Sequence, residues 1–255
     1  MENSMNAFSL SGRTALVTGG SRGIGAAIVD LFAAQGAKVG FCQFGDDANA
    51  KATEKRMAAR GTPVVQTVCD VAKDGDVERL AGWADGALGP VDILVNCAGI
   101  GGEVPFEEIS VAAFDRMIGV HLRGTFMVTQ RFYGGMAARG WGRIINFSSQ
   151  LAYKGGLNMT HYCAAKAGIV GFTRALAYEA APKGVTVNSI APGPIETDML
   201  MGLTDEWRAW KQGQLPIGRF GQTGEIAPTA LLLASDAGSY YVGQTLSPNG
   251  GDVLI

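Results

Sequence analysis

The sequence is poor in the residues that build metal centres and disulfide frameworks. Its 255 residues include only four cysteines and two histidines, and no two cysteines form a C-x-x-C pair. No histidine lies at a zinc-finger spacing from a cysteine, so we expect no metal site. We interpret the cysteines as free thiols in a reducing, cytoplasmic compartment. They are Cys42, Cys69, Cys97 and Cys163.

The sequence also lacks a large excess of charge of either sign and any long hydrophobic run. The formal net charge is -2, which leaves no basic excess for binding nucleic acid. No apolar run approaches the ~18 residues that a membrane span needs. Residues 1–6 lack the basic and apolar regions of a secretory signal. We therefore expect a soluble cytoplasmic protein that binds neither nucleic acid nor membrane.

Short apolar runs alternate with amphipathic helical stretches, and no linker or repeat divides the chain. The predicted strands are 13–18, 37–42, 63–69, 91–95, 142–148 and 184–190, and the predicted helices are 23–35, 74–87, 111–133 and 160–180. Near-continuous apolar strands separated by helices indicate a parallel sheet that is covered on both faces. We predict one α/β domain over residues 1–255, with a doubly wound, mostly parallel, seven-stranded sheet of Rossmann type and helices on both faces.

A glycine-rich turn connects the first predicted strand to the first predicted helix. Gly19, Gly23 and Gly25 follow a G-x-x-x-G-x-G spacing. Glycine permits a tight turn and a close approach of backbone to phosphate, and the following helix offers free N–H groups. The turn therefore predicts a nucleotide-binding site.

A second motif lies in the predicted helix 160–180. Tyr162 and Lys166 are four residues apart, so they share one helix face, and Ser149 precedes the tyrosine by thirteen residues. A cation beside a phenol lowers the pKa of the phenol and makes it a proton donor and acceptor near neutral pH. A nucleotide turn combined with a proton-transfer pair suggests a nicotinamide-dependent oxidoreductase.

In this order, the motifs resemble the classical short-chain dehydrogenase/reductase family over essentially the whole chain. They are the turn at 18–25, Asp70, the N-C-A-G run at 96–99, Ser149, Tyr162-x-x-x-Lys166 and Pro192-Gly193. The resemblance implies that Ser149 polarises a substrate carbonyl and that Tyr162 transfers the proton. It implies that Lys166 holds the nicotinamide ribose, and the family spacing selects Ser149 over Ser148.

The same resemblance implies the cofactor contacts. Asp70 and Val71 are expected near the adenine, residues 96–99 at the sheet centre, and Ile195 and Thr197 near the nicotinamide carboxamide. The expected cofactor-binding residues are Gly19, Ser21, Arg22, Gly23, Ile24, Gly25, Asp70, Val71, Asn96, Ala98, Gly99, Tyr162, Lys166, Pro192, Gly193, Ile195 and Thr197.

The choice of cofactor depends on the residue that meets the adenosine ribose. An acidic residue at the end of the second strand would repel a 2′-phosphate, but that place is taken by Gln43. Arg22 lies in the glycine turn, where it can pair with the extra phosphate. We therefore favour NADP(H), while NAD(H) stays open because Asp46 follows closely.

One position departs from the family pattern. Most relatives carry an asparagine in the middle of the long helix predicted here at 111–133, where this chain has His121. The family asparagine links the lysine to solvent in a proton relay. An imidazole also donates and accepts hydrogen bonds and titrates near neutral pH, so we treat His121 as a catalytic candidate, with a structural histidine as the alternative. His161 either faces away or lines the substrate mouth.

Several features bear on substrate and assembly. The segment at about 193–219 is predicted to be a substrate lid, with a packed surface helix as the alternative. The sequence from 142 to 200 resembles those of 3-oxoacyl-acyl-carrier-protein reductases, which suggests a 3-oxoacyl thioester as the substrate. NAD-dependent polyol, sugar or cyclic-alcohol dehydrogenases are the alternative, and a cofactor-binding sensor or scaffold is the non-enzyme alternative.

The resemblance also implies partners. A homo-oligomer, a tetramer in most relatives, is expected through the long central helices. Docking of an acyl carrier protein needs a basic patch near the site, for which the candidates are Arg123, Arg131, Arg139 and Arg143.

Overall fold

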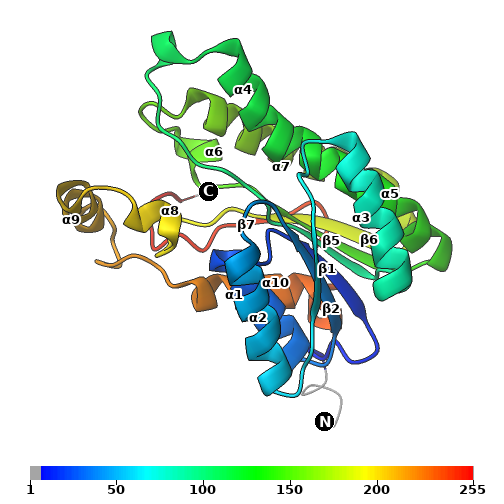
Figure 1. The fold of residues 1–255 in the computed structure, drawn as a ribbon. Coiled ribbons are helices and arrows are strands. Elements are labelled where there is room, and N and C mark those ends of the chain that lie inside the picture. The colour runs from blue at the N-terminus through cyan, green and yellow to red at the C-terminus, as the bar shows by residue number, and fades with distance from the viewer. Residues whose placement is uncertain (1–6, 255) are drawn as a thin grey trace.

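The computed structural model describes residues 7–254 and has a central sheet between two helical layers (Figure 1). Seven parallel strands follow the order β3-β2-β1-β4-β5-β6-β7. The order reverses direction at β1, so the predicted doubly wound Rossmann-type sheet is confirmed. Residues 1–6, on which the expectation about a secretory signal rested, lie outside the described residues.

The bounds of the elements follow the predicted alternation. The strands are β1 Thr14–Thr18, β2 Lys38–Gln43, β3 Val65–Val68, β4 Ile93–Asn96, β5 Gly142–Phe147, β6 Val185–Ile190 and β7 Thr245–Leu246. The helices are α1 Gly23–Ala34, α2 Asp47–Ala59, α3 Asp74–Ala87, α4 Val111–Ile118, α5 Gly124–Arg139, α6 Leu151–Lys154, α7 Thr160–Ala180, α8 Asp198–Met201, α9 Asp205–Gly213 and α10 Thr223–Ala234.

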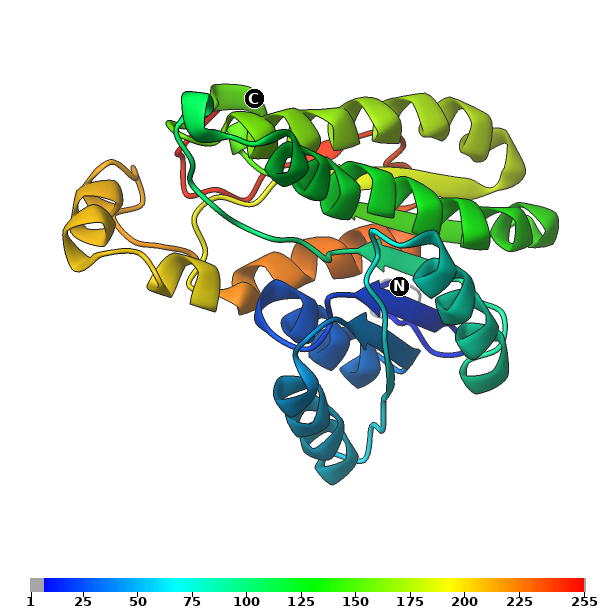
Figure 2. The same cartoon turned by 45° about the horizontal axis from the view of Figure 1, so that its top comes forward.

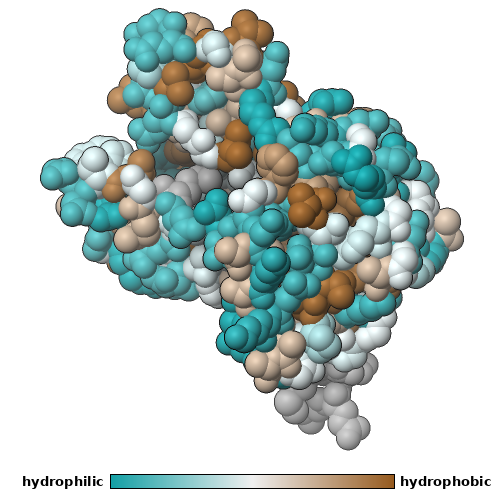
Figure 3. Space-filling view, viewed as in Figure 1, coloured by the Kyte–Doolittle hydropathy of each residue, from teal (hydrophilic) through white to brown (hydrophobic). Residues whose placement is uncertain are grey.

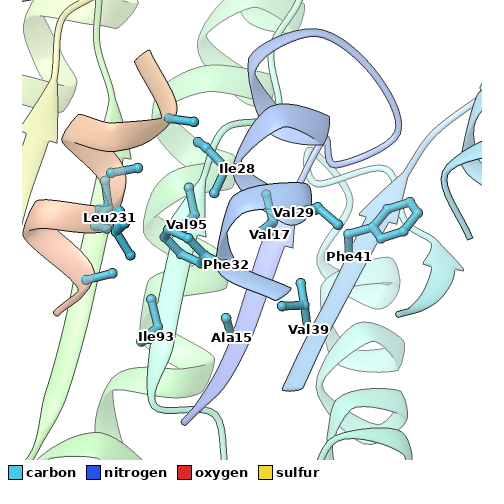
Figure 4. Close-up of a cluster of buried hydrophobic side chains, with 14 of the residues drawn as sticks. Ala15, Val17, Ile28, Val29, Phe32, Val39, Phe41, Ile93, Val95 and Leu231 are labelled. Atoms are coloured by element: carbon cyan, nitrogen blue, oxygen red, sulfur yellow. The ribbon is translucent and has the colours of Figure 1, made fainter. Parts of the chain in front are cut away.

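The hydrophobic core has two halves, one on each face of the sheet. Helices α1 and α10 cover one face, and α3, α5 and α7 cover the other (Figures 1 and 2). Figure 4 shows Ile28, Val29 and Phe32 of α1 lying against β-strand side chains, with Leu231 of α10 beside them. Central strands with side chains buried on both faces need continuous apolar sequences, which is why these strands could be predicted from the sequence.

Several elements lie outside the prediction, among them α2, α10 and β7, and one predicted helix is divided. Helix α2 was not expected, because its sequence is polar and buries only Ala50, Thr53 and Met57 against the body. The predicted helix 111–133 is divided by a π-helical turn at Gly119–Arg123 and continues to the end of α5. Such turns are frequent at functional sites, and this one contains His121.

Loops at the carboxyl ends of the central strands gather on one side of the molecule with α4, α6, α8 and α9 (Figures 1 and 2). Ligands of open α/β sheets bind at this end. Over the face drawn in Figure 3, hydrophilic and hydrophobic residues are interspersed. Within residues 7–254, no helix is both long and apolar enough to cross a membrane.

Candidate active site

The glycine turn forms a close-fitting cradle between β1 and α1. Gly19 has a φ of +70°, and a Cβ atom there would lie 2.9 Å from the Cα of Ala98. A Cβ at Gly25 would collide with the carbonyl oxygen of Gly19. Helix α1 begins without a side-chain hydrogen bond from its N-cap residue Arg22, so its first N–H groups are open to an anion. Backbone alone fills this turn, which fits a bound dinucleotide phosphate.

The two ends of the expected cofactor site meet at this turn. The side chain of Thr197 comes within 3.4 Å of the position that a Cβ on Gly23 would take. Ile195, just before it, is buried. Gly193 packs so closely against Asn249 that a Cβ would lie 2.6 Å from the Cα of that residue. The loop after β6 therefore borders the glycine turn, as the cofactor contacts require.

Polar side chains surround the place expected for the adenosine ribose. The Ser21 hydroxyl donates to Asp46 at 2.6 Å, and Arg22 Nε lies 3.6 Å from the same carboxylate. Gln43 is buried and donates to Asp47 at 2.5 Å, while its own amide oxygen accepts the N–H of Asp46. Arg22 stays 60% exposed and is therefore accessible to a phosphate.

The residues expected near the adenine and at the sheet centre are held from several elements. Asp70 is buried, and both its carboxylate oxygens accept hydrogen bonds from Arg116 of α4, at 2.9 and 3.0 Å. Asn96 donates to Thr129 and Asn146, each at 2.9 Å. The other residues expected to bind the cofactor lie in the glycine turn, at the start of α1 and in loops at the carboxyl ends of the strands. They are Ser21, Ile24, Val71, Ala98, Gly99 and Pro192.

Thr18 at the end of β1 holds the start of the loop after β4. Its hydroxyl accepts hydrogen bonds from the N–H groups of Cys97 and Ala98, at 3.1 and 3.0 Å. Burial raises the pKa of the Cys97 thiol to about 12. A thiol that stays protonated is not a nucleophile, so Cys97 is a packing residue.

The structure brings Ser149, Tyr162 and Lys166 together at the carboxyl end of β5. The Ser149 side chain lies beside the Tyr162 hydroxyl and acts to lower its pKa, and Lys166 Nζ lies 5.6 Å from the centre of the Tyr162 ring. Lys166 is buried and donates from Nζ to the carbonyl oxygen of Phe147 at 2.7 Å. The Ser148 hydroxyl instead donates to the backbone oxygen of Lys166 at 2.8 Å, which leaves Ser149 as the serine beside the tyrosine.

Burial controls the proton affinities of this group. Burial raises the pKa of Tyr162 to about 12, although the hydrogen bond with Ser149 acts in the lowering direction. Burial also lowers the pKa of Lys166 to about 8. The sequence suggested a lowered tyrosine pKa. In this structure desolvation is the largest influence on the phenol, and Lys166 donates to the Phe147 carbonyl oxygen.

His121 lies against the tyrosine and the loop after β4. Its ring is 5.4 Å from that of Tyr162 in an edge-to-face arrangement. Its Nε2 is 2.9 Å from the carbonyl oxygen of Ile100, while Nδ1 is buried without a partner. Burial, followed by the charge of Lys166, lowers the His121 pKa well below its usual value. The expectation that this imidazole titrates near neutral pH is therefore wrong, and His121 is neutral there.

His161 is also buried, with its Nδ1 unpartnered, so it does not lie on an exposed substrate mouth. Within residues 7–254, no cluster of three or more histidine, cysteine, aspartate or glutamate side chains could hold a metal ion. The four cysteines are free thiols. The groups gathered beside β5 are the Ser149 hydroxyl, the Tyr162 phenol and the Lys166 ammonium.

Named proteins are similar to this sequence over nearly its whole length. A family model described as enoyl-(acyl carrier protein) reductase matches residues 19–252. Acetoacetyl-CoA reductase of Rhizobium meliloti (strain 1021) is 42% identical over 246 residues, covering 94% of this chain and 98% of the relative. The chain belongs to the short-chain dehydrogenase/reductase family. It is accordingly an oxidoreductase that acts on CH–OH and C=O groups.

Two further members of the family illustrate its range. The 3-oxoacyl-acyl-carrier-protein reductase of Aquifex aeolicus is 37% identical over 243 residues, 95% of this chain and 98% of the relative. A solved structure of a putative NAD(P)-dependent gluconate 5-dehydrogenase from Beutenbergia cavernae, with bound NADP at low occupancy, has a TM-score of 0.92 and 38% identity. It covers 96% of this chain and 98% of that one.

Sequence reasoning missed two contacts of this short-chain dehydrogenase/reductase. Arg116 neutralises Asp70, and Gln150, next to Ser149, donates its side-chain N–H to Asp252 in the C-terminal tail. Gln150 and Asp252 are 102 residues apart, and no local pattern links them. Only the closing fold brings such residues together.

Proposed function

We propose that this short-chain dehydrogenase/reductase transfers a hydride between NADP(H) and a ketone or secondary alcohol, with a 3-oxoacyl thioester as the substrate class. The proposal depends mainly on one observation. Ser149, Tyr162 and Lys166 lie together at the carboxyl end of β5, at the end of the sheet where the glycine turn forms its phosphate cradle. Proton transfer and nucleotide binding thus occupy one side of the sheet.

The residues of the site divide the work on the substrate oxygen. When bound, the cofactor supplies the hydride. Ser149 donates a hydrogen bond that orients the carbonyl oxygen, and Tyr162 gives its proton to the oxygen as negative charge develops there. Because the pKa of Tyr162 is about 12, the phenol is protonated at neutral pH and is available as the proton donor. Lys166, in its charged form, binds the ribose hydroxyls.

His121 is proposed to act as a hydrogen-bond acceptor in the relay that returns a proton to the site. Its Nε2 lies 2.9 Å from the carbonyl oxygen of Ile100 and 3.2 Å from the backbone nitrogen of the same residue, so the tautomer decides whether Nε2 donates to the oxygen or accepts from the N–H. With the proton on Nε2, the buried, unpartnered Nδ1 is the free acceptor. The neutral ring then takes part in the relay as an acceptor at Nδ1, without serving as a charged group at neutral pH.

NADP(H) is favoured by the charge around the ribose position. Arg22 is exposed next to the open N-terminus of α1, and the end of β2 carries the neutral, hydrogen-bonded Gln43. A 2′-phosphate can replace the exposed carboxylate of Asp198, which holds Arg22 Nη1 at 3.0 Å. The Beutenbergia gluconate 5-dehydrogenase structure, which has bound NADP, supports the same choice.

Exposed apolar side chains on loops after the central strands support a substrate with an acyl chain. Phe106 follows β4, Leu157 follows β5 and Met201 follows β6, and all three are more than half exposed. Such a rim stabilises an apolar chain by removing it from water. The Rhizobium relative is named an acetoacetyl-CoA reductase, and acetoacetyl-CoA is a short 3-oxoacyl thioester.

The candidate arginines for an acyl carrier protein are already engaged. Three form ion pairs and one donates to a backbone oxygen. Arg131 pairs with Asp74 and Glu78, Arg139 with Asp92, and Arg143 with Asp236, while Arg123 donates to the oxygen of Ala72. Because three of these four cations are paired with carboxylates, we propose a coenzyme A thioester in preference to a carrier-protein thioester.

Residues 193–219 are proposed to form the substrate lid. Helices α8 and α9 project from the body at one side of the molecule (Figure 1). Leu200, Trp207 and Leu215 of the segment form a small separate cluster with Phe220, the residue that follows it. A segment with its own small core can move as a unit over the site.

We also propose that the enzyme is a cytoplasmic homotetramer. The free thiols suit a reducing compartment. On α5 and α7, the exposed Phe126 and the half-buried Phe172 form an aromatic pair with ring centres 6.3 Å apart. Apolar residues on paired long helices are suited to packing against a second copy. Light scattering on a sizing column tests this state, and a monomer would contradict it.

A substrate panel tests the proposed reaction. NADPH and NADH oxidation would be followed with acetoacetyl-CoA, a 3-oxoacyl-acyl-carrier-protein and a cyclic ketone, and NADP⁺ reduction with gluconate. We expect the highest kcat/KM for acetoacetyl-CoA with NADPH. Turnover of gluconate or a cyclic substrate without turnover of either thioester would overturn the substrate class. NADPH binding without turnover of any compound would favour the sensor alternative.

A further inference from the structure

A buried carboxylate in the C-terminal tail joins three other parts of the chain. The Asp252 side chain is only 4% exposed. Lys211 of α9 donates from Nζ to both its oxygens, at 2.6 and 2.7 Å, and Lys154 of α6 donates to Oδ1 at 2.8 Å. Gln150, the residue after Ser149, donates to Oδ2. One carboxylate thus connects the proposed lid, the tail and the loop that carries the catalytic serine.

Apart from this contact, α9 is hydrogen-bonded within its own segment. Thr204 caps its N-terminus, Arg208 donates to the oxygen of Met201, and Gln212 donates to the oxygen of Gly218. In the described part of the chain, the pair Lys211–Asp252 is the one side-chain hydrogen-bonding connection from α9 to a residue outside 198–219. The apolar cluster around Trp207 also belongs to residues 200–220. Among side-chain hydrogen bonds, the attachment of α9 itself therefore depends on this carboxylate, while Ile217, after the helix, is held by its N–H donating to the oxygen of Gly250 at 3.1 Å.

The loop that carries Ser149 and Gln150 is connected to the proposed lid at two points. The backbone N–H of Gln150 donates to the oxygen of Pro192, where the segment leaves β6, at 3.1 Å. Its side chain reaches Asp252 and, through it, Lys211 in α9. The position of the lid and the position of Ser149 are thereby coupled.

We propose that Asp252 is a positioning residue that fastens α9 over the substrate site and fixes it relative to Ser149. The inference rests on the proposed function, because it assigns the fastening of the lid of that same site. Two lysines share one buried carboxylate. Removing its charge leaves their ammonium groups side by side without a counter-ion, so they repel each other and α9 is released. A released lid holds the substrate in place less well.

The test replaces Asp252 by the isosteric amide. Asp252→Asn is expected to speed amide exchange in 205–213 about tenfold or more and to raise KM for the carbonyl substrate by about 10- to 100-fold. kcat is expected to fall less, and the dissociation constant of NADPH to stay within about twofold. Asp252→Glu keeps the charge and is expected to retain protection of α9. The matched control is Asp30→Asn, which removes a carboxylate shared by Arg56 and Arg60 between α1 and α2.

If Asp252→Asn fails to fold, Lys211→Gln removes the same connection from the lid side and is expected to release α9 equally. Unchanged exchange and unchanged KM in either folded variant would overturn the inference, as would a raised KM with α9 as protected as in the wild type. A wild-type enzyme that reduces no carbonyl would refute the proposed function alone, since the exchange of α9 still tests the fastening.

Discussion

Lys166 Nζ lies 2.7 Å from the carbonyl oxygen of Phe147, the last residue of β5. This contact holds the ammonium group at the end of the strand, inside the molecule and beside Tyr162. Burial of this charge is unfavourable, as the lowered pKa of about 8 shows. A buried cation with a shifted pKa in a cleft is characteristic of functional sites, which is the basis for proposing a role for Lys166.

Lys166→Met should remove turnover and stabilise the fold at neutral pH. An unfolded lysine has a pKa of 10.5 and the folded one about 8, so the folded chain binds fewer protons between these values. The free energy of unfolding of the wild type therefore rises with pH from about 8 to 10.5, by about 3 kcal/mol. The variant lacks this rise, so its advantage is largest below pH 8. Denaturant unfolding across pH 7–10.5 measures the difference, and parallel pH profiles would contradict it.

Gly25→Ala should abolish cofactor binding. The added Cβ would collide with the Gly19 carbonyl oxygen, so the phosphate turn has to open. The matched control is Gly82→Ala, at an exposed position of α3 where a Cβ meets no atom within 4 Å. That change should stabilise the helix by about 0.5–1 kcal/mol. NADPH fluorescence titration and thermal melting separate the two, and tight NADPH binding by Gly25→Ala would be the contrary result.

Arg22→Ala should weaken discrimination between the two cofactors. Loss of a charged hydrogen bond to the 2′-phosphate corresponds to about 1.5–3 kcal/mol, so KM for NADPH should rise at least about tenfold while KM for NADH changes little. Arg60→Ala, another exposed arginine in an ion pair, serves as the control. Equal effects on NADPH and NADH would show that Arg22 does not contact the 2′-phosphate.

His121→Asn tests whether the imidazole has a role of its own. Asparagine can replace the hydrogen bond to Ile100 but leaves a smaller side chain against the Tyr162 ring. We expect turnover to fall several-fold. The variant and the wild type should have pH profiles of the same shape near pH 6.5, because the His121 pKa lies well below that value. Profiles of kcat against pH for both proteins provide the measurement. Disappearance of an inflection near neutral pH would show that a charged imidazole takes part.

The sheet and the site motifs were predictable because short-range sequence patterns determine them. Central strands such as β4 are buried on both faces and therefore read as continuous apolar runs. Tyr162 and Lys166 share a helix face through their four-residue spacing. Helix α2 escaped prediction because its sequence is polar, and its attachment depends on three small or medium side chains.

Other features depend on the assembled fold. The π-helical turn around His121 and the raised pKa of Tyr162 follow from packing and desolvation that no local spacing reveals. The contact between Lys211 and Asp252 joins residues 41 positions apart. Long-range ion pairs of this kind need the positions of several loops at once.

The most direct test of the mechanism is the rate of NADPH oxidation by Tyr162→Phe with acetoacetyl-CoA, beside Tyr178→Phe, an exposed tyrosine of the same helix. Loss of the phenol proton should lower kcat by about 10²- to 10⁴-fold, with NADPH binding and thermal stability kept, while Tyr178→Phe should match the wild type. A Tyr162→Phe enzyme that retains turnover within a few-fold of the wild type would contradict proton transfer by Tyr162.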